Sequence, residues 1–544
     1  MARVRLRELI YRRAGGPRHE VAVGGLFALW LVVVLLGALH HVVWRDEVRA
    51  LSIALQGDDI PAMVHGLHGE GHPAVWYLLL RGAYALFGIP QVLQGVAFGV
   101  AAVTMLALVA WSPFALPVLA LLFFGRGAIY EYSVMARNYG ISILLLFVLA
   151  AAYERYRRRG IVIGIVLAIL ANCNAHSDVI VFAFLIFWYL DVFYRGGEQP
   201  TADIKVFLMN AGIAGVGCAV AGWTLYSPLV DAVVIHQPEG FLATRISLAM
   251  FLPIVSYEHL VGGPPIALLS EQHTPFNEVV LLVRYVLLSL LLIGCTLGLA
   301  RRPAALVGCL TALFGLSLFF QLVYPGSYRH EALWLAFLVA MYWIAARDGQ
   351  TGGSTIQPTR ARFVTTATKI GYVSFVILLV IQIPSGFRDV INIVGGEYQE
   401  SQSMNFSMML SKHKELRGAV ILADPDYVLD SLPYYISNKL YFIRDRRYAK
   451  YAIYARGSSS RIGLGDILAQ ARAIQAAMRR PVIVLLQQKL DPAAPARVVS
   501  EGLNGELSLT PEDIRAFQTS TRLLGRSVAT LTDENFDVYI LNDI

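Results

Sequence analysis

The sequence predicts a mainly α-helical protein that crosses a membrane many times and ends in a small α/β domain. Three observations support this prediction. Of the 544 residues, 56% are hydrophobic and only 15% are charged, whereas a soluble globular protein is typically about 45–50% apolar and about 25% charged. The apolar residues form long runs before residue 388. After it, shorter strand-like runs surround one amphipathic helical segment.

The long apolar runs are the candidate membrane helices, because a spanning helix needs roughly 20 mostly apolar residues. They lie near residues 21–43, 72–90, 92–110, 113–130, 138–153, 160–173, 178–195, 206–226, 279–300, 304–323, 331–346 and 370–386. The first run follows an arginine-rich start, exceeds a signal-peptide core in length and has no small-residue cleavage site. We therefore expect it to be retained as the first membrane helix.

The basic clusters indicate which runs cross. Arginine and lysine gather at 155–159, 301–302 and 360–369, and such clusters usually face the cytoplasm. All of them fall on that side only if residues 72–90, which contain Arg81, lie along the membrane surface or dip in and return. The sequence therefore predicts about 11 crossings, a cytoplasmic N-terminus and interfacial helices in the first outer loop.

The C-terminal part has the pattern of an α/β domain. Residues 418–429, 480–490 and 535–543 are strand-like, and residues 465–480 form an amphipathic helical pattern. An odd number of crossings places this part outside the cytoplasm. We therefore predict a transmembrane domain over residues 1–388 and an extracytoplasmic α/β domain over residues 389–544.

Charge and cysteine usage exclude other classes of protein. The net charge is +7 with a sequence pI near 9.1, but the basic residues belong to predicted cytoplasmic loops and form no separate patch interleaved with aromatics. Nucleic acid is therefore not an expected partner. The cysteines lie in or beside apolar runs without metal-ligand spacing, which predicts neither a disulfide framework nor a zinc site. They are Cys173, Cys218, Cys295 and Cys309.

The predicted topology gathers polar stretches on the outer face. They are residues 44–47, 69–73, 129–140, 174–178, 227–278 and 324–331. The predicted cytoplasmic loops are short and basic by comparison. The active or binding face is therefore expected to look outward.

Asp46 and Glu47 follow the first membrane helix. Burying a carboxylate at the edge of the membrane costs free energy unless the group is hydrated or paired with a cation, and such residues often have a function. At the membrane surface they can act as a general base toward a hydroxyl or hold a divalent cation through their oxygens. The alternative is structural, with Asp46 capping a helix over residues 47–55.

Two arginines are predicted at the outer ends of membrane helices. Arg137 lies beside Glu131 and Tyr139, and Arg329 is followed by His330. A guanidinium group suits a phosphate because of its planar fork, although an arginine can also reach toward lipid headgroups. His72, which precedes a proline, is expected to lie near Asp46. The polar stretch at 171–178 could line the same cavity, but we interpret it as a turn.

These motifs together resemble the GT-C superfamily of polytopic membrane glycosyltransferases. The resemblance is to the bacterial branch related to protein O-mannosyltransferases and lipid A aminoarabinose transferases. It spans roughly residues 20–390 and rests on "WRDE", "EGHPAVWYLLLR", "YEYSVMARNYG" and "YRHEALWL". One departure is "GHPA" in place of the commoner "HPP", which affects the shape of the first outer loop.

The resemblance implies an enzyme of the bacterial cytoplasmic membrane. Such enzymes take a sugar from a polyprenyl-phosphate-linked donor and pass it to a lipid, glycan or protein acceptor. The catalytic carboxylate is then Asp46 or Glu47. For such an enzyme we expect the residues that bind substrate or phosphate to be His72, Glu131, Arg137, Tyr139, Arg329 and His330. No cofactor is implied apart from a possible divalent cation.

Two other functions remain as alternatives. A transporter or flippase for a lipid-linked sugar would place ionisable residues near the middle of the bilayer and have inverted repeats, and we find neither pattern in the sequence. A ligase or polymerase of the O-antigen type would not need carboxylates after the first helix. The membrane glycosyltransferase is therefore the leading hypothesis.

Overall fold

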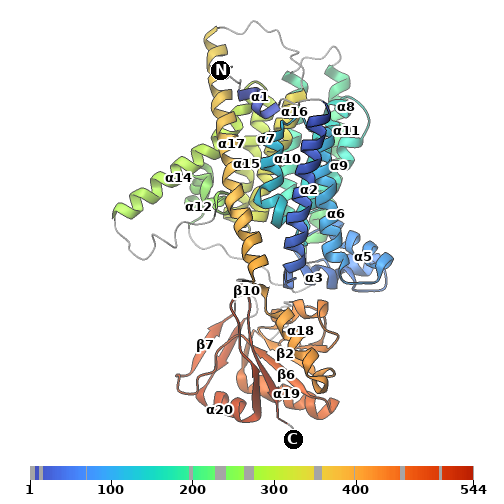
Figure 1. The fold of residues 1–544 in the computed structure, drawn as a ribbon, viewed down its shortest axis with the longest axis vertical. Coiled ribbons are helices and arrows are strands. Elements are labelled where there is room, and N and C mark those ends of the chain that lie inside the picture. Colours follow the sequence, from blue (N-terminus) through green and yellow to red (C-terminus); the bar gives the residue numbers. More distant parts are fainter. Residues whose placement is uncertain are drawn as a thin grey trace.

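The chain forms a bundle of membrane-length helices with an α/β domain at one end (Figure 1). The structure is a computed structural model, and it describes residues 6–11, 16–68, 70–194, 200–226, 241–262, 275–347, 358–396, 399–453, 460–501 and 505–542. A long helix, α17 (Pro358–Gly395), runs the length of the bundle and leads into the α/β domain. This arrangement confirms the predicted fold class.

Within the described residues, eight helices are long and apolar enough to cross a membrane. They are α2 (Pro17–His40), α6 (Val92–Trp111), α8 (Tyr139–Tyr156), α10 (Ala175–Tyr194), α11 (Pro200–Leu225), α14 (Pro275–Thr296), α15 (Pro303–Leu322) and α17. Many large apolar side chains on their outer faces are exposed, such as Leu29 and Val32 of α2. Such faces suit contact with lipid. The chain is a multi-pass membrane protein.

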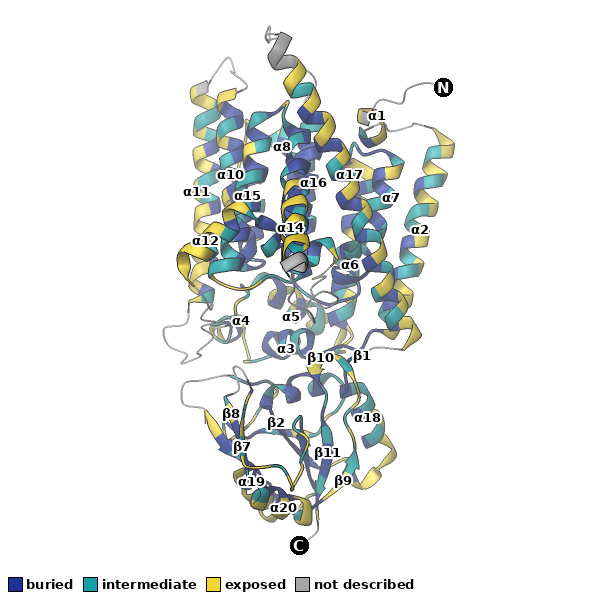
Figure 2. Ribbon diagram, turned by 90° about the vertical axis from the view of Figure 1, so that its left-hand side faces the viewer, coloured by how far each residue is buried: buried dark blue, intermediate teal, exposed yellow. Residues whose placement is uncertain are grey.

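The other predicted runs also form helices. They are α7 (Leu116–Phe124), α9 (Val162–Ala171) and α16 (Tyr328–Arg347). Helix α16 is buried around its whole circumference and forms the centre of the bundle (Figure 2), as expected of a helix that is apolar on every side. Helix α9, at 10 residues, is about half as long as the roughly 30 Å hydrocarbon core.

Residues 72–90 do not cross the bundle. They form α5 (Val75–Phe87), which has 13 residues. Its first amide, of Val75, donates to the carbonyl of Asn172 at 3.3 Å. The chain then enters α6, where Gln94 accepts from Tyr434 of the C-terminal domain at 2.6 Å. Both ends of α5 therefore lie at the end of the bundle that faces the C-terminal domain, as predicted.

The end of the bundle away from the C-terminal domain carries Arg302, Arg347 and the N-terminal helix. Away from the C-terminal domain, Arg347 donates to the carbonyl of Ala151 at 2.9 Å, and Arg302 pairs with Asp191 at 3.0 Å. The short helix α1 (Leu6–Tyr11) lies at this same end (Figure 1). The N-terminal helix and the C-terminal domain are thus at opposite ends, as an odd number of crossings requires.

Between the bundle and the C-terminal domain lie α3 (Arg45–Ala54) and α4 (Ile60–His65) of the predicted first outer loop (Figure 2). A π-helical turn, η1 (Gly127–Glu131), follows α7, and π-turns of this kind are frequent at functional sites. Helix α12 (Leu242–Phe251) and two 3₁₀ turns, η2 (Pro253–Ser256) and η3 (His259–Val261), belong to the predicted outer stretch 227–278. The rest of that stretch, at 227–240 and 263–274, lies outside the described residues.

The C-terminal domain begins later than predicted, because α17 continues through residue 388 to Gly395. Its strands are β1 (Gln399–Ser401), β2 (Val420–Asp424), β3 (Lys439–Phe442), β4 (Arg447–Tyr448), β5 (Arg461–Gly463), β6 (Val482–Leu486), β7 (Arg497–Ser500), β8 (Glu506–Leu509), β9 (Thr521–Gly525), β10 (Thr530–Glu534) and β11 (Asp537–Leu541). The central sheet has the order β4-β3-β2-β6-β11-β9. The three predicted strands are its neighbours β2, β6 and β11.

Helices cover both faces of the central sheet. Helices α19 (Leu464–Met478) and α20 (Pro511–Ser520) pack on one face of β2 and β6, and α18 (Ser403–Lys412) packs on the other. Strands β2 and β6 are parallel and buried on both faces, which explains their continuous apolar sequence. Their carboxyl ends, where ligands of parallel sheets usually bind, are followed by Tyr427 and Gln487, which face the cavity described below.

Candidate active site at the junction of the bundle and the C-terminal domain

Asp46 and Glu47 occupy adjacent positions at the start of α3. The helix begins at Arg45 with Trp44 as its N-cap, so Asp46 is not the capping residue. Because an α-helix turns by about 100° per residue, the two carboxylates point in different directions. Asp46 lines a cavity, whereas Glu47 is 0% exposed and is not among the lining residues.

Glu47 holds the surrounding backbone in place. Its Oε1 accepts from the amide of Ala136 at 2.6 Å, and its Oε2 accepts from the amide of Trp44 at 3.2 Å. His41 contacts the same Oε2 at 2.9 Å through Nε2. Glu47 therefore fixes the loop that carries Arg137 and the turn that carries Asp46. We expect it to be a positioning residue, and its predicted part in catalysis would be indirect.

Two arginines converge on one oxygen of Asp46. The distance from Arg137 Nη1 to Asp46 Oδ2 is 2.9 Å, and that from Arg329 Nη2 to the same oxygen is 3.5 Å. Arg137 belongs to the loop after the π-turn and Arg329 to the start of α16, so elements far apart in the sequence form the cluster. The Arg329 guanidinium also lies over the Trp44 ring, 5.8 Å from its centre.

The arginines determine the charge of the site. Burial alone would raise the pKa of Asp46, but Arg137 and Arg329 outweigh it and lower this pKa to about 2. Burial and the neighbouring Arg137 lower the pKa of His72 to about 3. His72 is therefore neutral at ordinary pH, and its Nε2 accepts from Arg137 Nη2 at 3.5 Å.

Tyr139 and His330 complete the cluster. His330 Nε2 lies 2.7 Å from the hydroxyl of Tyr139, and His330 Nδ1 accepts from the amide of Ser327 at 2.9 Å. The Nε2 proton is thus free to be donated to the tyrosine. The His72 ring meets the Tyr139 ring edge-on, with 5.8 Å between centres. His72, Arg137, Tyr139, Arg329 and His330 all line the cavity with Asp46.

Glu131 does not join this group. It is the last residue of the π-turn, it is buried, and it pairs with Arg126 at 3.3 Å. Arg126 also pairs with Asp389 of α17 at 2.6 Å. Glu131 is not among the residues that line the cavity, and through Arg126 it links the π-turn to α17.

The C-terminal domain forms the opposite wall of the cavity. This wall was not predicted, because its residues are brought to the site only by contacts across hundreds of positions. Arg49 Nη1 donates to Asp430 Oδ2 at 2.9 Å, and Arg45 pairs with Asp533. The domain contributes Tyr427, Asp430, Gln487, Gln488, Ser500, Glu501 and Asp533. Tyr427 and Gln487 lie near the ends of two predicted strand-like runs, but nothing in the sequence indicated that they reach the site.

The cavity between these walls has a volume of about 980 Å³. This is at the upper end of the range of roughly 300–1,000 Å³ found for small-molecule sites. Several buried polar atoms of its lining have no partner among the described residues: Trp44 Nε1, His72 Nδ1, Trp76 Nε1, Asn138 Oδ1, both His176 nitrogens and Arg329 Nε. Since buried polar groups are nearly always hydrogen-bonded, these atoms give the lining the capacity to bind polar groups in the cavity.

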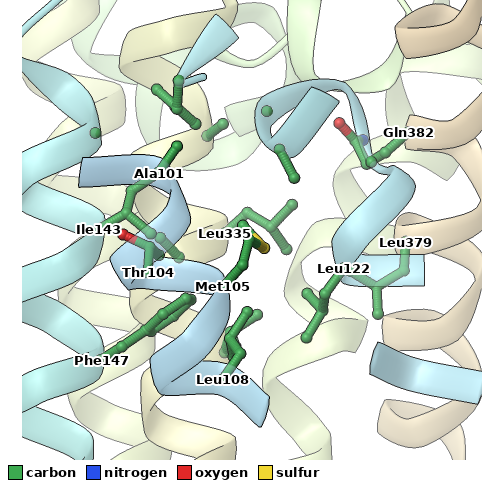
Figure 3. Close-up of a pocket in the computed structure, with 18 of the residues that line it drawn as sticks. Ala101, Thr104, Met105, Leu108, Leu122, Ile143, Phe147, Leu335, Leu379 and Gln382 are labelled. Carbon is green, nitrogen blue, oxygen red and sulfur yellow. The ribbon is translucent and has the colours of Figure 1, made fainter. Parts of the chain in front are cut away.

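A second, apolar pocket lies inside the bundle (Figure 3). It has a volume of about 90 Å³ and lies among α6, α7, α8, α16 and α17, with Met105, Leu108 and Leu335 on its walls. Gln382 and Thr104 are among its few polar residues. A pocket of this composition accepts hydrocarbon and excludes charge.

The described residues include no group of three His, Cys, Asp or Glu side chains arranged to hold a metal ion. Two carboxylates that line the cavity are already paired with arginine, Asp46 with Arg137 and Glu70 with Arg49. A divalent cation at Asp46 would therefore have to compete with the arginines or take further ligands from a substrate.

Two solved structures resemble the chain over nearly its whole length. The crystal structure of ArnT from Cupriavidus metallidurans in the apo state has a TM-score of 0.43 and 10% sequence identity, covering 95% of this chain and 98% of that chain. The crystal structure of the same protein bound to undecaprenyl phosphate has a TM-score of 0.41 and 10% identity, covering 96% of this chain and 97% of that chain. No protein-family model and no curated protein sequence matches the chain.

Proposed function

We propose that the protein is a membrane glycosyltransferase. It moves a sugar from a polyprenyl-phosphate-linked donor to an envelope lipid, glycan or protein acceptor on the outer face of the cytoplasmic membrane. One observation carries the proposal: the Asp46 carboxylate, held by Arg137 and Arg329, lines a large polar cavity at the end of a membrane bundle. A carboxylate beside two guanidinium groups combines a proton acceptor with a phosphate site.

In the proposed reaction, the acceptor hydroxyl attacks the anomeric carbon of the donor. Asp46 takes the hydroxyl proton as the new carbon–oxygen bond forms. The bond between the anomeric carbon and the phosphate oxygen breaks, and its electron pair leaves with the polyprenyl phosphate. The products are the glycosylated acceptor and the polyprenyl phosphate, and Asp46 then releases its proton to water.

The arginines link donor binding to the activation of the base. In the empty site both contact Asp46, and they hold the pKa of its carboxyl near 2, which makes it a weak base. A donor phosphate competes for the same guanidinium groups, because charge-assisted bidentate pairs are the strongest available to them. As the arginines turn to the phosphate, the pKa of Asp46 rises and the carboxylate becomes a better proton acceptor.

The bundle supplies the environment for the lipid part of the donor. The apolar pocket among α6, α7, α8, α16 and α17 is suited to part of an isoprenoid chain. The large cavity between the bundle and the C-terminal domain is suited to the charged and polar parts of the donor. This division supports a lipid-linked donor, since a soluble sugar nucleotide would not need an enzyme embedded in the membrane.

The experiment that tests this function is mass spectrometry of envelope lipids and glycans from a deletion strain. The strain is complemented with the wild-type protein or with Asp46→Asn. We expect one glycan modification to disappear on deletion, to return with the wild type and to stay absent with the variant at equal protein levels. An unchanged set of glycans and lipids in the deletion strain would contradict the proposal.

The orientation belongs to the same proposal, because the donor face must look outward. A Lys450→Cys variant places a thiol on the exposed surface of the C-terminal domain. In whole cells we expect it to react with a membrane-impermeant maleimide reagent. Reaction only after the cytoplasmic side is opened would reverse the topology and place the site on the wrong face.

A further inference from the structure

His176, near the start of α10, has no hydrogen-bond partner. Its side chain lines the large cavity, and the residue is only 5% exposed. Neither Nδ1 nor Nε2 has a partner among the described residues. Because more than about 90% of buried polar groups are hydrogen-bonded in native structures, two unpartnered nitrogens on one buried ring give this ring the capacity to bind a polar group in the cavity.

The ring belongs to a recess of aromatic and imidazole side chains. His176 stacks on His330 with 4.5 Å between ring centres, and its centre is 4.9 Å from that of Phe319. We call this group the imidazole recess; its members are His72, Tyr139, His176, Phe319, Tyr324 and His330. All of them line the cavity.

The histidines of the recess differ in how their nitrogens are used. Both nitrogens of His330 have partners, Ser327 and Tyr139. His72 uses Nε2 toward Arg137, and its Nδ1 is unpartnered. His176 has both nitrogens available. His330 therefore fixes the shape of the recess, while His176 has the capacity to bind a ligand.

The chemistry of the recess selects an uncharged, hydroxyl-bearing ligand. A neutral imidazole offers one donor and one acceptor, which matches a hydroxyl group. The members of the recess include no carboxylate to pair with an ammonium group. They also include no lysine or arginine for an acidic group; the nearby guanidinium groups of Arg137 and Arg329 are directed at Asp46.

The recess adjoins the phosphate site. His72 contacts Arg137, and Arg137 contacts Asp46. His330 follows Arg329 directly in α16. A group attached to a phosphate held by the two arginines would therefore lie against the recess.

We propose that the imidazole recess binds the sugar ring of the donor, and that His176 hydrogen-bonds a hydroxyl of an uncharged sugar. This inference rests on the proposed function. It narrows the donor to a neutral sugar, in contrast to an amino sugar that carries an ammonium group. His176 acts in sugar recognition and takes no part in proton transfer.

The test compares defined lipids binding to the purified full-length protein, measured by native mass spectrometry. The probes are undecaprenyl phosphate, its glucose, mannose and galactose esters, and its 4-amino-4-deoxyarabinose ester. We expect wild type to bind at least one neutral-sugar lipid about threefold to tenfold more tightly than undecaprenyl phosphate, as one or two hydrogen bonds allow. The ammonium-sugar lipid should gain no such preference.

Three variants separate a binding role from a packing role. His176→Phe keeps the stacked ring but removes both nitrogens. The ratio of its affinity for the neutral-sugar lipid to its affinity for undecaprenyl phosphate should therefore fall to about one, while undecaprenyl phosphate still binds. His176→Gln keeps a donor and an acceptor and should retain part of the preference. His65→Phe, at an exposed histidine, is the matched control and should behave as wild type.

The outcomes distinguish this inference from the function it rests on. If wild type binds no undecaprenyl lipid, the proposed function fails. If it binds undecaprenyl phosphate but prefers no neutral-sugar lipid, or prefers the ammonium-sugar lipid, only the inference is overturned. The inference is also overturned if His176→Phe keeps the wild-type preference, because the nitrogens would then not bind the sugar. It is overturned as well if His176→Phe no longer binds undecaprenyl phosphate, because the loss would then not be specific to the sugar.

Discussion

The two walls of the cavity carry opposite charge. The wall formed by the bundle and the first outer loop has more arginines than carboxylates, with Arg137 and Arg329 around Asp46. The wall formed by the C-terminal domain presents Asp430, Glu501 and Asp533, and the described residues that line it include no lysine or arginine. The first wall suits a phosphate, and the second suits a neutral or cationic part of a substrate.

The same side-chain type therefore behaves differently on the two walls. Arg137 and Arg329 lower the pKa of Asp46 to about 2 in spite of burial. On the other wall, burial raises the pKa of Asp430 to about 6, although Arg49 opposes the shift. Asp46 is ionised at every physiological pH and can accept a proton, whereas Asp430 titrates close to the physiological range. The proposed function therefore assigns the catalytic charge to the membrane wall, and the variants below test this assignment.

The largest expected effect is that of Asp46→Asn. The change keeps the shape of the side chain and removes the proton acceptor. General-base contributions are typically about 10²–10⁴-fold in rate, so we expect transfer to fall by at least that factor while the protein folds and inserts normally. The measurement is the release of polyprenyl phosphate by purified enzyme with a competent donor and acceptor.

Asp58→Asn is the matched control for this change, because Asp58 is an exposed carboxylate of the same loop. It should leave the rate unchanged. Near-normal transfer by Asp46→Asn would mean that the base lies elsewhere. The comparison of the two walls would then lose its functional meaning, and the carboxylates of the C-terminal wall would be tested next.

Much of the membrane wall could be predicted from the sequence. The apolar runs and basic loops determine which segments cross, and this placed Asp46, Arg137 and Arg329 at one end of the bundle. Residues 72–90 were correctly excluded from crossing because their inclusion would reverse the side of each basic cluster. Strands β2 and β6 were predictable because parallel, doubly buried strands are continuous apolar runs. Strand β11, which pairs antiparallel with β6 and β9, also has a largely apolar sequence.

The rest depends on contacts that sequence patterns do not encode. The roles of Asp46 and Glu47 differ because α3 begins at Arg45, which directs Asp46 into the cavity and leaves Glu47 buried. His176 was interpreted as part of a turn, but α10 begins at Ala175 and directs it to the cavity. Asp430 lies at the site, where it pairs with Arg49 across 381 positions of the sequence.

The next largest effect concerns the contact between the walls. His41 lies buried between Glu47, at 2.9 Å, and Glu400 of β1, at 3.1 Å. Burial lowers its pKa, but the two carboxylates outweigh burial and raise it to about 10. His41→Gln leaves two buried carboxylates without their cation. Such a loss typically costs about 3–5 kcal/mol, which thermal unfolding of the full chain would measure.

This contact also predicts a pH dependence. Because the folded pKa of His41 is raised, its contribution to stability is complete below about pH 6.5 and is lost as the pH rises toward 10. Wild type should therefore lose more stability than His41→Gln between these pH values. His40→Gln, at the exposed neighbour, serves as the control, and an equal pH dependence in all three proteins would show that His41 does not bind the walls together.

A smaller effect is expected from lysine in place of either arginine. Arg137→Lys and Arg329→Lys keep the charge but lose the planar fork that binds phosphate through two parallel hydrogen bonds. Losing one such bond corresponds to about tenfold in affinity. Undecaprenyl phosphate binding should weaken by that factor, and Arg155→Lys at the opposite end of the bundle should have no effect. Unchanged binding of undecaprenyl phosphate in both variants would show that Arg137 and Arg329 do not form the phosphate site.

The smallest expected effect is that of Asp430→Asn on the opposite wall. Asparagine can still accept a hydrogen bond from the amide of Ala452, which donates to Asp430 at 2.8 Å. Arg49 also retains its ion pair with Glu70. We therefore expect a change in stability of about 1 kcal/mol or less at pH 8, with transfer nearly unchanged. Because burial raises the folded pKa of Asp430 to about 6, wild type should lose stability as the pH rises from about 4 to 6, and the variant should lack this slope. A loss of transfer like that of Asp46→Asn would instead place catalytic charge on both walls.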